Sequence, residues 1–440
     1  MSEYFDELVG RACADLAPEE SLTANINGEQ SDFVRFNDAA IRQAGSVRQL
    51  ELDIDLGVGD RHCGGTITLA GDPEIDDARV ATLVTSLRER RAVVPADPYL
   101  LTPDEVHSTD RRRTGSLPEP EAAVGAIRDV GADCDLVGVY AAGSSFSGFA
   151  DSRGQRNWFE TANFNLDWSF YLRTDKAAQN LYAGVDWSEE ALTQKMAWSV
   201  QQLDVLHRES IDLAPGGYRT YLAPSAMREI SDMLAWGGFG LKAHRTKYTP
   251  LLRMVTEGAA LHPSVTITED TAGGTAPYFQ EQGFLRPDAV TLVDAGSYAD
   301  WLVSPRSARE FGVATNGASA EELPTALHLH AGSLPTGEVI EQLGTGLFVG
   351  NLWYLNFSDR AACRTTGMTR FSTFWVEDGE IVAPVNVLRF DDTAYHLLGD
   401  KLVGLTDETE LLLDSSSYGR RSTDSVRLPG ALVEEMMFTL

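Results

Sequence analysis

The sequence predicts an α+β protein, with an N-terminal sheet-and-helix domain followed by a strand-rich, barrel-like or sandwich-like C-terminal domain. Apolar residues at helical spacing over residues 4–16 predict an amphipathic opening helix. Residues 49–56 alternate polar and apolar side chains, which is typical of a strand with one solvated face. Near the other end, Asp378-Gly379 lies between two apolar runs and predicts a β-hairpin with a type I′ turn.

Length and composition are those of a folded protein with more than one core. The 440 residues suggest two or three domains, and the contents of hydrophobic (43%) and charged (23%) residues are ordinary for globular chains. The stretch IDLAPGG at residues 211–217 has the composition of a connection. We therefore predict an N-terminal α+β domain over 1–210 and a strand-rich domain over 211–440.

The first half contains alternating signals for strands and helices. In chain order they predict a strand through 49–56, its partner over 61–70, helices over 76–94 and 119–130, strands over 135–147 and 148–160, and a helix over 188–206. Residues 96–121 are rich in Pro, Ser, Thr and charge and predict a linker-like loop. Its basic run, Arg111 to Arg113, is interpreted as solvated loop, with contact to an acidic partner surface as the alternative.

The second half begins with a predicted strand over 218–223 and a helix over 224–235, which Pro-Ser opens. Residues 271–284 form a Gly-rich loop of the kind that either moves or receives a ligand. In the late hairpin, a two-residue turn predicts the pairs Val376 with Ile381, Trp375 with Val382, Phe374 with Ala383, and Glu377 with Glu380.

Two segments of this half resemble the TldD/PmbA family, the so-called modulators of gyrase, which comprises metallopeptidases and their partner subunits. LPTGEVIEQLGTGL at residues 334–347 is similar to the family's turn, helix and Gly-Leu strand, and WVEDGEIVAPV at 375–385 is similar to its hairpin. The resemblance is to the PmbA side, also called TldE. It implies a protein that works as a dimer, with a chamber between subunits.

The family's metal motif is missing from this chain. In TldD-type members, the helix corresponding to residues 224–235 carries H-E-x-x-x-H, in which two histidines bind zinc and the glutamate activates water. Here residues 230–236 contain no histidine, and no His-Glu pair occurs anywhere in the sequence. The resemblance thus implies a PmbA/TldE-like, non-metal subunit of a TldD/TldE-type metallopeptidase that acts on peptides or unfolded protein segments. The alternative is a homo-oligomeric peptide-binding or scaffold protein without proteolytic activity.

The sequence predicts candidate residues for substrate binding. It predicts no catalytic residue and no cofactor. Peptide contact is predicted for the Gly-rich loop and the late hairpin, at Gly273, Gly274, Thr275, Asp378 and Gly379.

An alternative metal site would use His328 and His330, which project from one face of a predicted strand, with Cys363 downstream. A structural zinc needs four ligands, so these are interpreted as ordinary strand histidines.

The net charge, the cysteines and the lack of long apolar runs indicate which partners and which location to expect. A net charge of −29 argues against binding to a nucleic-acid backbone, which requires clustered Lys and Arg. No run approaches the length of a membrane span, the start is acidic where a signal peptide would be basic, and four scattered cysteines are typical of a reduced compartment. We expect a cytoplasmic protein whose partner is a TldD-like metallopeptidase subunit or a second copy of itself.

An almost unbroken apolar run over residues 347–357 is the physical reason to expect a dimer. Such a run is either buried on both faces of a sheet or partly covered by an interface, because large exposed apolar patches are uncommon on soluble monomers.

Overall fold

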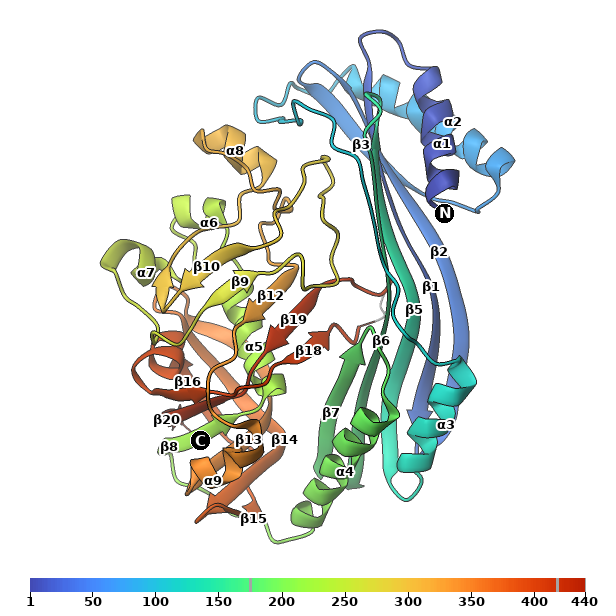
Figure 1. The fold of residues 1–440 in the computed structure, drawn as a ribbon. Helices are drawn as coiled ribbons and strands as arrows, with labels where there is room; N and C mark the ends of the chain where they lie inside the picture. Colours follow the sequence, from blue (N-terminus) through green and yellow to red (C-terminus); the bar gives the residue numbers. More distant parts are fainter. Residues whose placement is uncertain (174–175, 417–418, 440) are drawn as a thin grey trace.

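The residues that the structure describes form three β-sheets with helices around them (Figure 1). The computed structural model describes residues 1–173, 176–416 and 419–439. The first sheet has the order β3-β2-β1-β5-β6-β4, with β7 on β6. Its strands are β1 Ser21–Asn37, β2 Ala40–Val58, β3 Arg61–Thr68, β4 Thr109–Arg113, β5 Asp135–Asp151, β6 Arg156–Arg173 and β7 Lys176–Gly184.

Four helices pack on this sheet. They are α1 Ser2–Ala14, α2 Pro73–Arg91, α3 Pro120–Val130 and α4 Glu189–Leu206. In Figure 1 α1, α2 and α3 lie on the outer side of the sheet, and α4 lies beside β7, toward the second half of the chain. Alternate residues of the strands supply the apolar face, so that Leu22, Ala24 and Ile26 of β1 pack with α1 and α2. Phe164 and Trp168 of β6 pack in the same way with α3 and α4.

The other two sheets are built entirely from strands after residue 215. One has the order β11-β10-β9-β12-β19-β18 and consists of β9 Ile267–Glu269, β10 Val290–Asp294, β11 Ser297–Tyr298, β12 Ala326–Leu329, β18 Glu410–Leu413 and β19 Ser425–Leu428. The other consists of β8 Gly216–Leu222, β13 Gly346–Asp359, β14 Arg364–Glu377, β15 Glu380–Pro384, β16 Arg389–Thr393, β17 Leu402–Leu405 and β20 Ala431–Phe438. Strands β13, β8, β20, β16 and β14 pair in that order, and β13 pairs with β14, so the ring closes as a barrel.

Short helices surround these strands. They are α5 Pro224–Ala235, α6 Leu241–Arg245, α7 Leu252–Glu257, α8 Pro305–Phe311 and α9 Val339–Leu343, with the shorter turns η1 Thr336–Glu338 and η2 His396–Asp400. Of these, α5, α7 and η2 share one large core with the strands, while α6 and α8 form a separate small cluster. A smaller cluster that includes Leu206, Phe348 and Phe374 joins α4 to the barrel. No helix among the described residues is long and apolar enough to cross a membrane.

The predicted fold class is confirmed: helices pack on a first sheet, and a strand-rich part with a closed barrel follows. The division into domains at residue 211 stays a prediction. The strands predicted over 135–147 and 148–160, with a turn around residues 151–154, are present as β5 and β6 with the turn at that place, and β6 continues to Arg173.

The basic run is a strand and not the predicted loop, although Arg111 and Arg112 are solvent-exposed as expected. Arg111 to Arg113 lie in β4, which pairs in parallel with β6 at the sheet edge. The Arg113 guanidinium donates to the carbonyl oxygens of Ala272 at 3.2 Å and Gly273 at 3.3 Å, and also to that of Gly274. The run therefore fastens the predicted Gly-rich loop to the first sheet, a long-range contact with no local sequence signal.

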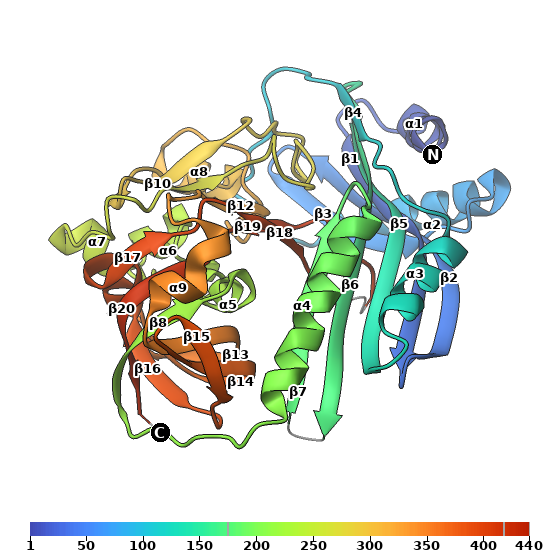
Figure 2. The same ribbon diagram turned by 60° about the horizontal axis from the view of Figure 1, so that its bottom comes forward.

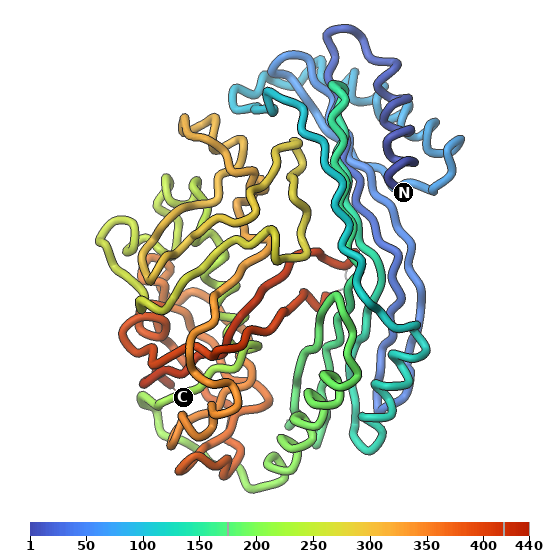
Figure 3. The backbone as a smooth tube through the Cα atoms, in the orientation of Figure 1, coloured from blue at the N-terminus to red at the C-terminus, as the bar shows by residue number. Residues whose placement is uncertain are grey.

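The late hairpin is present, but its register was only partly predicted. Val376 faces Ile381 and Glu377 faces Glu380, as expected. Beyond these pairs the prediction is wrong, because a bulge at Val382 moves Ala383 opposite Trp375 and Pro384 opposite Phe374. Figure 3 shows the hairpin at the lower end of the barrel.

The apolar run at the start of β13 divides into two parts. Leu347, Val349 and Leu352 are buried in the second-half core. Trp353 and Tyr354, by contrast, are 46% and 74% exposed. Burial within the barrel thus explains the first part of the run and leaves two large aromatic side chains on the surface.

The turn at Gly379 provides a stability test of the hairpin. Its φ is +79°, a left-handed value that a β-branched residue adopts only with strain. We expect Gly379→Val to lower the free energy of unfolding by about 1–3 kcal/mol. Urea denaturation measures the change. Gly337→Val is the matched control, because a Cβ at Gly337 meets no atom within 4 Å; equal effects of the two substitutions would contradict the turn assignment.

Candidate functional site

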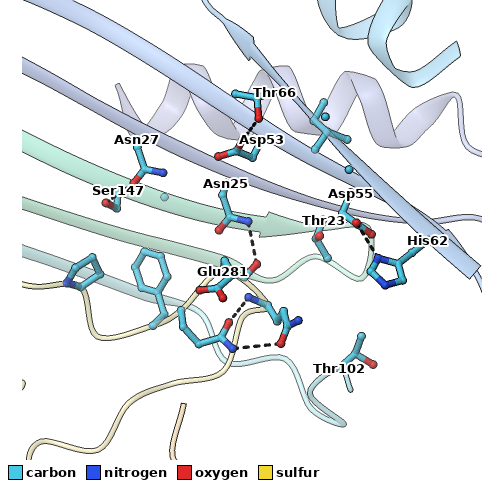
Figure 4. Close-up of a pocket in the computed structure, with 18 of the residues that line it drawn as sticks. Thr23, Asn25, Asn27, Asp53, Asp55, His62, Thr66, Thr102, Ser147 and Glu281 are labelled. Carbon is cyan, nitrogen blue, oxygen red and sulfur yellow. Dashed lines mark hydrogen bonds and ion pairs between the residues drawn. The ribbon is translucent and has the colours of Figure 1, made fainter. Parts of the chain in front are cut away.

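A cleft of about 650 Å³ lies between the inner face of the first sheet and loops of the second half. Figure 4 shows the side chains that line it, which come mainly from β1, β2 and β3 on one side and from the segment after the Gly-rich turn on the other. The lining is rich in amide, hydroxyl and carboxylate groups.

The strand alternation places these polar groups in the cleft. On β1, Thr23, Asn25 and Asn27 point away from the helices, because the residues between them pack against α1 and α2. Asp53 and Asp55 of β2 do the same, directly opposite Asn25 and Thr23 in the sheet. The solvated face predicted for residues 49–56 is therefore a wall of the cleft.

His62 links this wall to the loop that precedes β4. Its Nδ1 lies 2.9 Å from a carboxylate oxygen of Asp55, and its Nε2 lies 3.4 Å from one of Asp97. The hydrogen bond to Asp55 is the main reason why the pKa of His62 is raised, with Asp97 adding to the effect. Arg306 of α8 also reaches Asp97, at 2.6 Å. Charge pairing thus connects the rim of the cleft to the second half.

The facing wall comes from residues 277–286. The carbonyl oxygen of Glu281 accepts a hydrogen bond from Asn25 at 2.9 Å, which joins the two walls (Figure 4). Arg286 also lines the cleft; its side chain is only 10% exposed and lies 3.8 Å from Glu269. Its Nε finds no hydrogen-bond partner among the described residues. The wall therefore holds a buried donor that the described residues leave unsatisfied.

A second arginine holds the two halves together next to the cleft. Arg421, which precedes β19, is 8% exposed and donates to Ser31 Oγ at 3.3 Å and to the carbonyl oxygens of Gly143 and Asn163 at 3.4 and 3.1 Å. Glu29, also buried, provides the opposing charge. The second half is thus attached to the polar face by a buried cation with several acceptors.

The predicted loop residues lie beside this cleft without lining it. Thr275 is fully buried and its hydroxyl donates to the carbonyl oxygen of Thr423 at 2.8 Å. Gly274 is packed so closely that an added Cβ would lie 2.4 Å from that of Ala326, and Gly273 binds the Asp270 carboxylate through its N–H. The lining residues follow a few positions later in the same loop.

The predicted hairpin residues are located elsewhere. The N–H of Gly379 donates to the carbonyl oxygen of Gly344 at 2.8 Å, and that of Asp378 to the Thr345 hydroxyl at 3.2 Å, so the turn rests on the segment before β13. The structure does not bring the two predicted groups together. Substrate contact by either group stays a prediction.

That residues of β1, β2 and β3 line a cleft was not predicted from the sequence, although the sequence pattern indicates a polar face. The alternation at residues 49–56 indicated which face is polar. It contained no information on what lies opposite, because the facing loop is more than 200 residues away along the chain.

The described residues do not fit a zinc site of the family's type. Helix α5 supplies Glu229 and Asp232, of which Asp232 lies 3.6 Å from Arg228. The rings of His328 and His330 stack with centroids 4.5 Å apart, and His328 faces Asp270 at 3.5 Å. Among the residues that the structure covers, no group of three or more His, Cys, Asp or Glu side chains could hold a metal ion.

The raised pKa of His62 predicts a pH-dependent contribution to stability. A folded-state pKa above the usual 6.5 means that protonated His62 stabilises the fold below that pH and that this contribution disappears as the pH rises through the raised pKa. We expect His62→Gln to cost about 0.5 kcal/mol more at about pH 5.5 than at about pH 8.5, since partial exposure screens the pairs. Urea denaturation at both pH values tests this, with the exposed His207→Gln as control. A cost that is independent of pH would contradict the assignment.

Solved structures with the same fold come from three organisms. TldE from Thermococcus kodakarensis aligns with a TM-score of 0.78 at 14% identity, over 99% of this chain and 100% of that one. A proposed modulator of DNA gyrase from Thermotoga maritima aligns with a TM-score of 0.75 at 13% identity, over 99% of both chains. A similar protein from Bacteroides thetaiotaomicron gives 0.74 at 14% identity, over 99% and 98%.

Comparison of the sequence with family models gives a match for the second half of the chain. No curated protein sequence matches the chain. The family model described as the PmbA/TldA metallopeptidase C-terminal domain matches residues 215–440, more than half of the protein. The chain is a member of the PmbA/TldD family.

Proposed function

We propose that this chain is the PmbA/TldE-like, non-metal subunit of a TldD/TldE-type metallopeptidase, and that its cleft receives peptides or unfolded protein segments. The observation that carries the proposal is the polar face of β1 in the cleft. Thr23, Asn25 and Asn27 recur at every second residue, about 6.7 Å apart, which is also the repeat of an extended peptide. Their amides and hydroxyl can both donate to and accept from a peptide backbone.

The facing wall supports the same role. Glu281 and Gln282 line the cleft from this side and add a carboxylate and an amide that can bond a peptide backbone. We propose that the Gly-rich loop contacts substrate mainly through residues 277–282, while Gly273, Gly274 and Thr275 hold it in place. In this proposal the metal and the activated water belong to the partner subunit, since α5 lacks histidine.

We also propose that the subunit associates through the exposed end of the β13–β14 pair, in the cytoplasm. The Arg370 guanidinium lies 4.1 Å from the ring centroid of the exposed Trp353 and 4.5 Å from that of Phe371. Tyr354 lies next to them with 74% exposure. Aromatic residues and arginine are the types enriched where interfaces contribute most to binding, and the partner is a TldD-like subunit or a second copy.

Metal content and activity test the non-metal role. We expect the purified chain to bind no stoichiometric zinc and to cleave no peptide alone, because the two histidines and the glutamate of the family's motif are missing. Mass spectrometry of the metal content and a digest of casein measure both. One zinc per chain, lost to a chelator together with activity, would contradict the proposal and direct attention to His328, His330 and Cys363.

Light scattering over a concentration series tests the association. We expect a dimer, either of the 48.0 kDa chain with itself or with a metal-bearing relative recovered from the host. The double substitution Trp353→Ser with Tyr354→Ser should weaken it about tenfold or more, since large buried aromatic side chains dominate such interfaces. Val403→Ser, at an exposed apolar residue on β17, is the control. A persistent monomer with no partner in the lysate would refute both the dimer and the split peptidase.

A further inference from the structure

A second cavity, here called the seam pocket, lies where α4 of the first half meets β8, β13 and η1 of the second half. Its volume is about 310 Å³, and no residue that lines it also lines the cleft. Figure 2 shows α4 running alongside the barrel at this junction. The seam pocket is therefore separate from the proposed peptide site.

Three aromatic rings from three different elements line the seam pocket. They are Trp198 of α4, Tyr221 of β8 and Phe348 of β13. The centroids of Trp198 and Phe348 are 6.0 Å apart with planes at 73°, and those of Tyr221 and Phe348 are 5.5 Å apart. This arrangement offers both ring faces and ring edges, which an aromatic ligand contacts favourably and which give water few hydrogen bonds.

The hydroxyl of Tyr221, which lines the seam pocket, has no hydrogen-bond partner among the described residues. Tyr221 is only 4% exposed, and buried tyrosine hydroxyls usually have a partner. Burial raises the pKa of Tyr221, and the nearby Glu410 carboxylate raises it further. The hydroxyl therefore stays protonated and is available to a ligand as donor or acceptor.

Lys195, Glu410 and Ser372, which lie at or near the seam pocket, already have partners. Lys195 Nζ lies 2.7 Å from Glu410 Oε2, which neutralises the two charges at the pocket. Ser372 donates a hydrogen bond of 2.6 Å to Gln202. Because the charges cancel, an ionic ligand would lose its hydration without gaining a free counter-charge.

We propose that the seam pocket binds a neutral aromatic group that carries one hydrogen-bonding substituent, such as a phenol or an indole. The rings of Trp198, Tyr221 and Phe348 contact the aromatic part, and the Tyr221 hydroxyl bonds the substituent. A volume of about 310 Å³ is at the lower end for ligand pockets and suits a single ring system. The proposal holds whether or not the chain serves a peptidase.

This chemistry has two possible sources, a Tyr or Trp side chain of a peptide and a free small aromatic molecule. Isothermal titration calorimetry of the full chain with p-cresol and with toluene tests the shared chemistry. We expect one p-cresol per chain, bound about fivefold more tightly than toluene, since one hydrogen bond distinguishes them. A heptapeptide with a central tyrosine, compared with its phenylalanine analogue, then assigns the source. Tighter binding of the tyrosine peptide than of p-cresol indicates a peptide ligand, and weaker binding a free molecule.

Three substitutions locate the binding. Tyr221→Phe should make p-cresol and toluene bind equally. Gly337→Trp should abolish the binding of both, because Gly337 lines the pocket and has open space around its Cβ position, whereas the control Gly337→Ala should leave it unchanged. Trp198→Phe should keep the calorimetric signal but remove the change in tryptophan fluorescence on binding.

The proposal is overturned if p-cresol fails to bind at millimolar concentration. It is also overturned if p-cresol binds Gly337→Trp as well as it binds Gly337→Ala, since binding then occurs elsewhere. Should Tyr221→Phe unfold, as its melting temperature would reveal, the two Gly337 variants still decide the question.

Discussion

The period of two along β1 and β2 is the constraint on which the rest of this structure depends. Leu52 and Ile54 face the helices, while Asp53 and Asp55 face the second half of the chain. A shift of the strands by one residue would exchange the two sets and place carboxylates under α1 and α2. Because carboxylates cannot be buried without partners, the polar face has to remain a cleft.

Two arginines keep the second half over this polar face. Arg113 binds three carbonyl oxygens of the Gly-rich loop, and Arg421 binds acceptors of the first sheet. Both contacts join a guanidinium to backbone oxygens, so they define the position of a loop more narrowly than apolar packing does. Loss of Arg421 would leave buried acceptors unpaired, which is costly, whereas the acceptors of Arg113 are partly exposed. These polar contacts act together with the packing of Phe149 and Phe159 on Phe279 to set the separation of the cleft walls.

Local patterns predicted much of the fold and little of the site. Helix α5 over Pro224–Ala235 and the turn at Gly379 follow from neighbouring residues, and both were predicted within a residue or two. The bulge at Val382 and the contact of Arg113 with Gly273 depend on packing between distant segments. No local sequence pattern predicts them. The predicted loop residues lie in the Gly-rich part of their loop, whereas the polar residues of the loop that line the cleft, such as Glu281 and Gln282, follow that part.

The polar inner face also bears on how the protein is made. Arg421 follows its partner Asn163 by 258 residues, so a ribosome completes the first sheet long before the segment that covers it. During that interval α1 to α4 already shield the larger apolar face, and the face still in contact with water is mostly polar, with Phe149 and Phe159 as the apolar residues that later pack on Phe279. Partly synthesised chains aggregate through exposed apolar surface. A sheet of this kind can fold early in synthesis and remain soluble until the rest of the chain arrives.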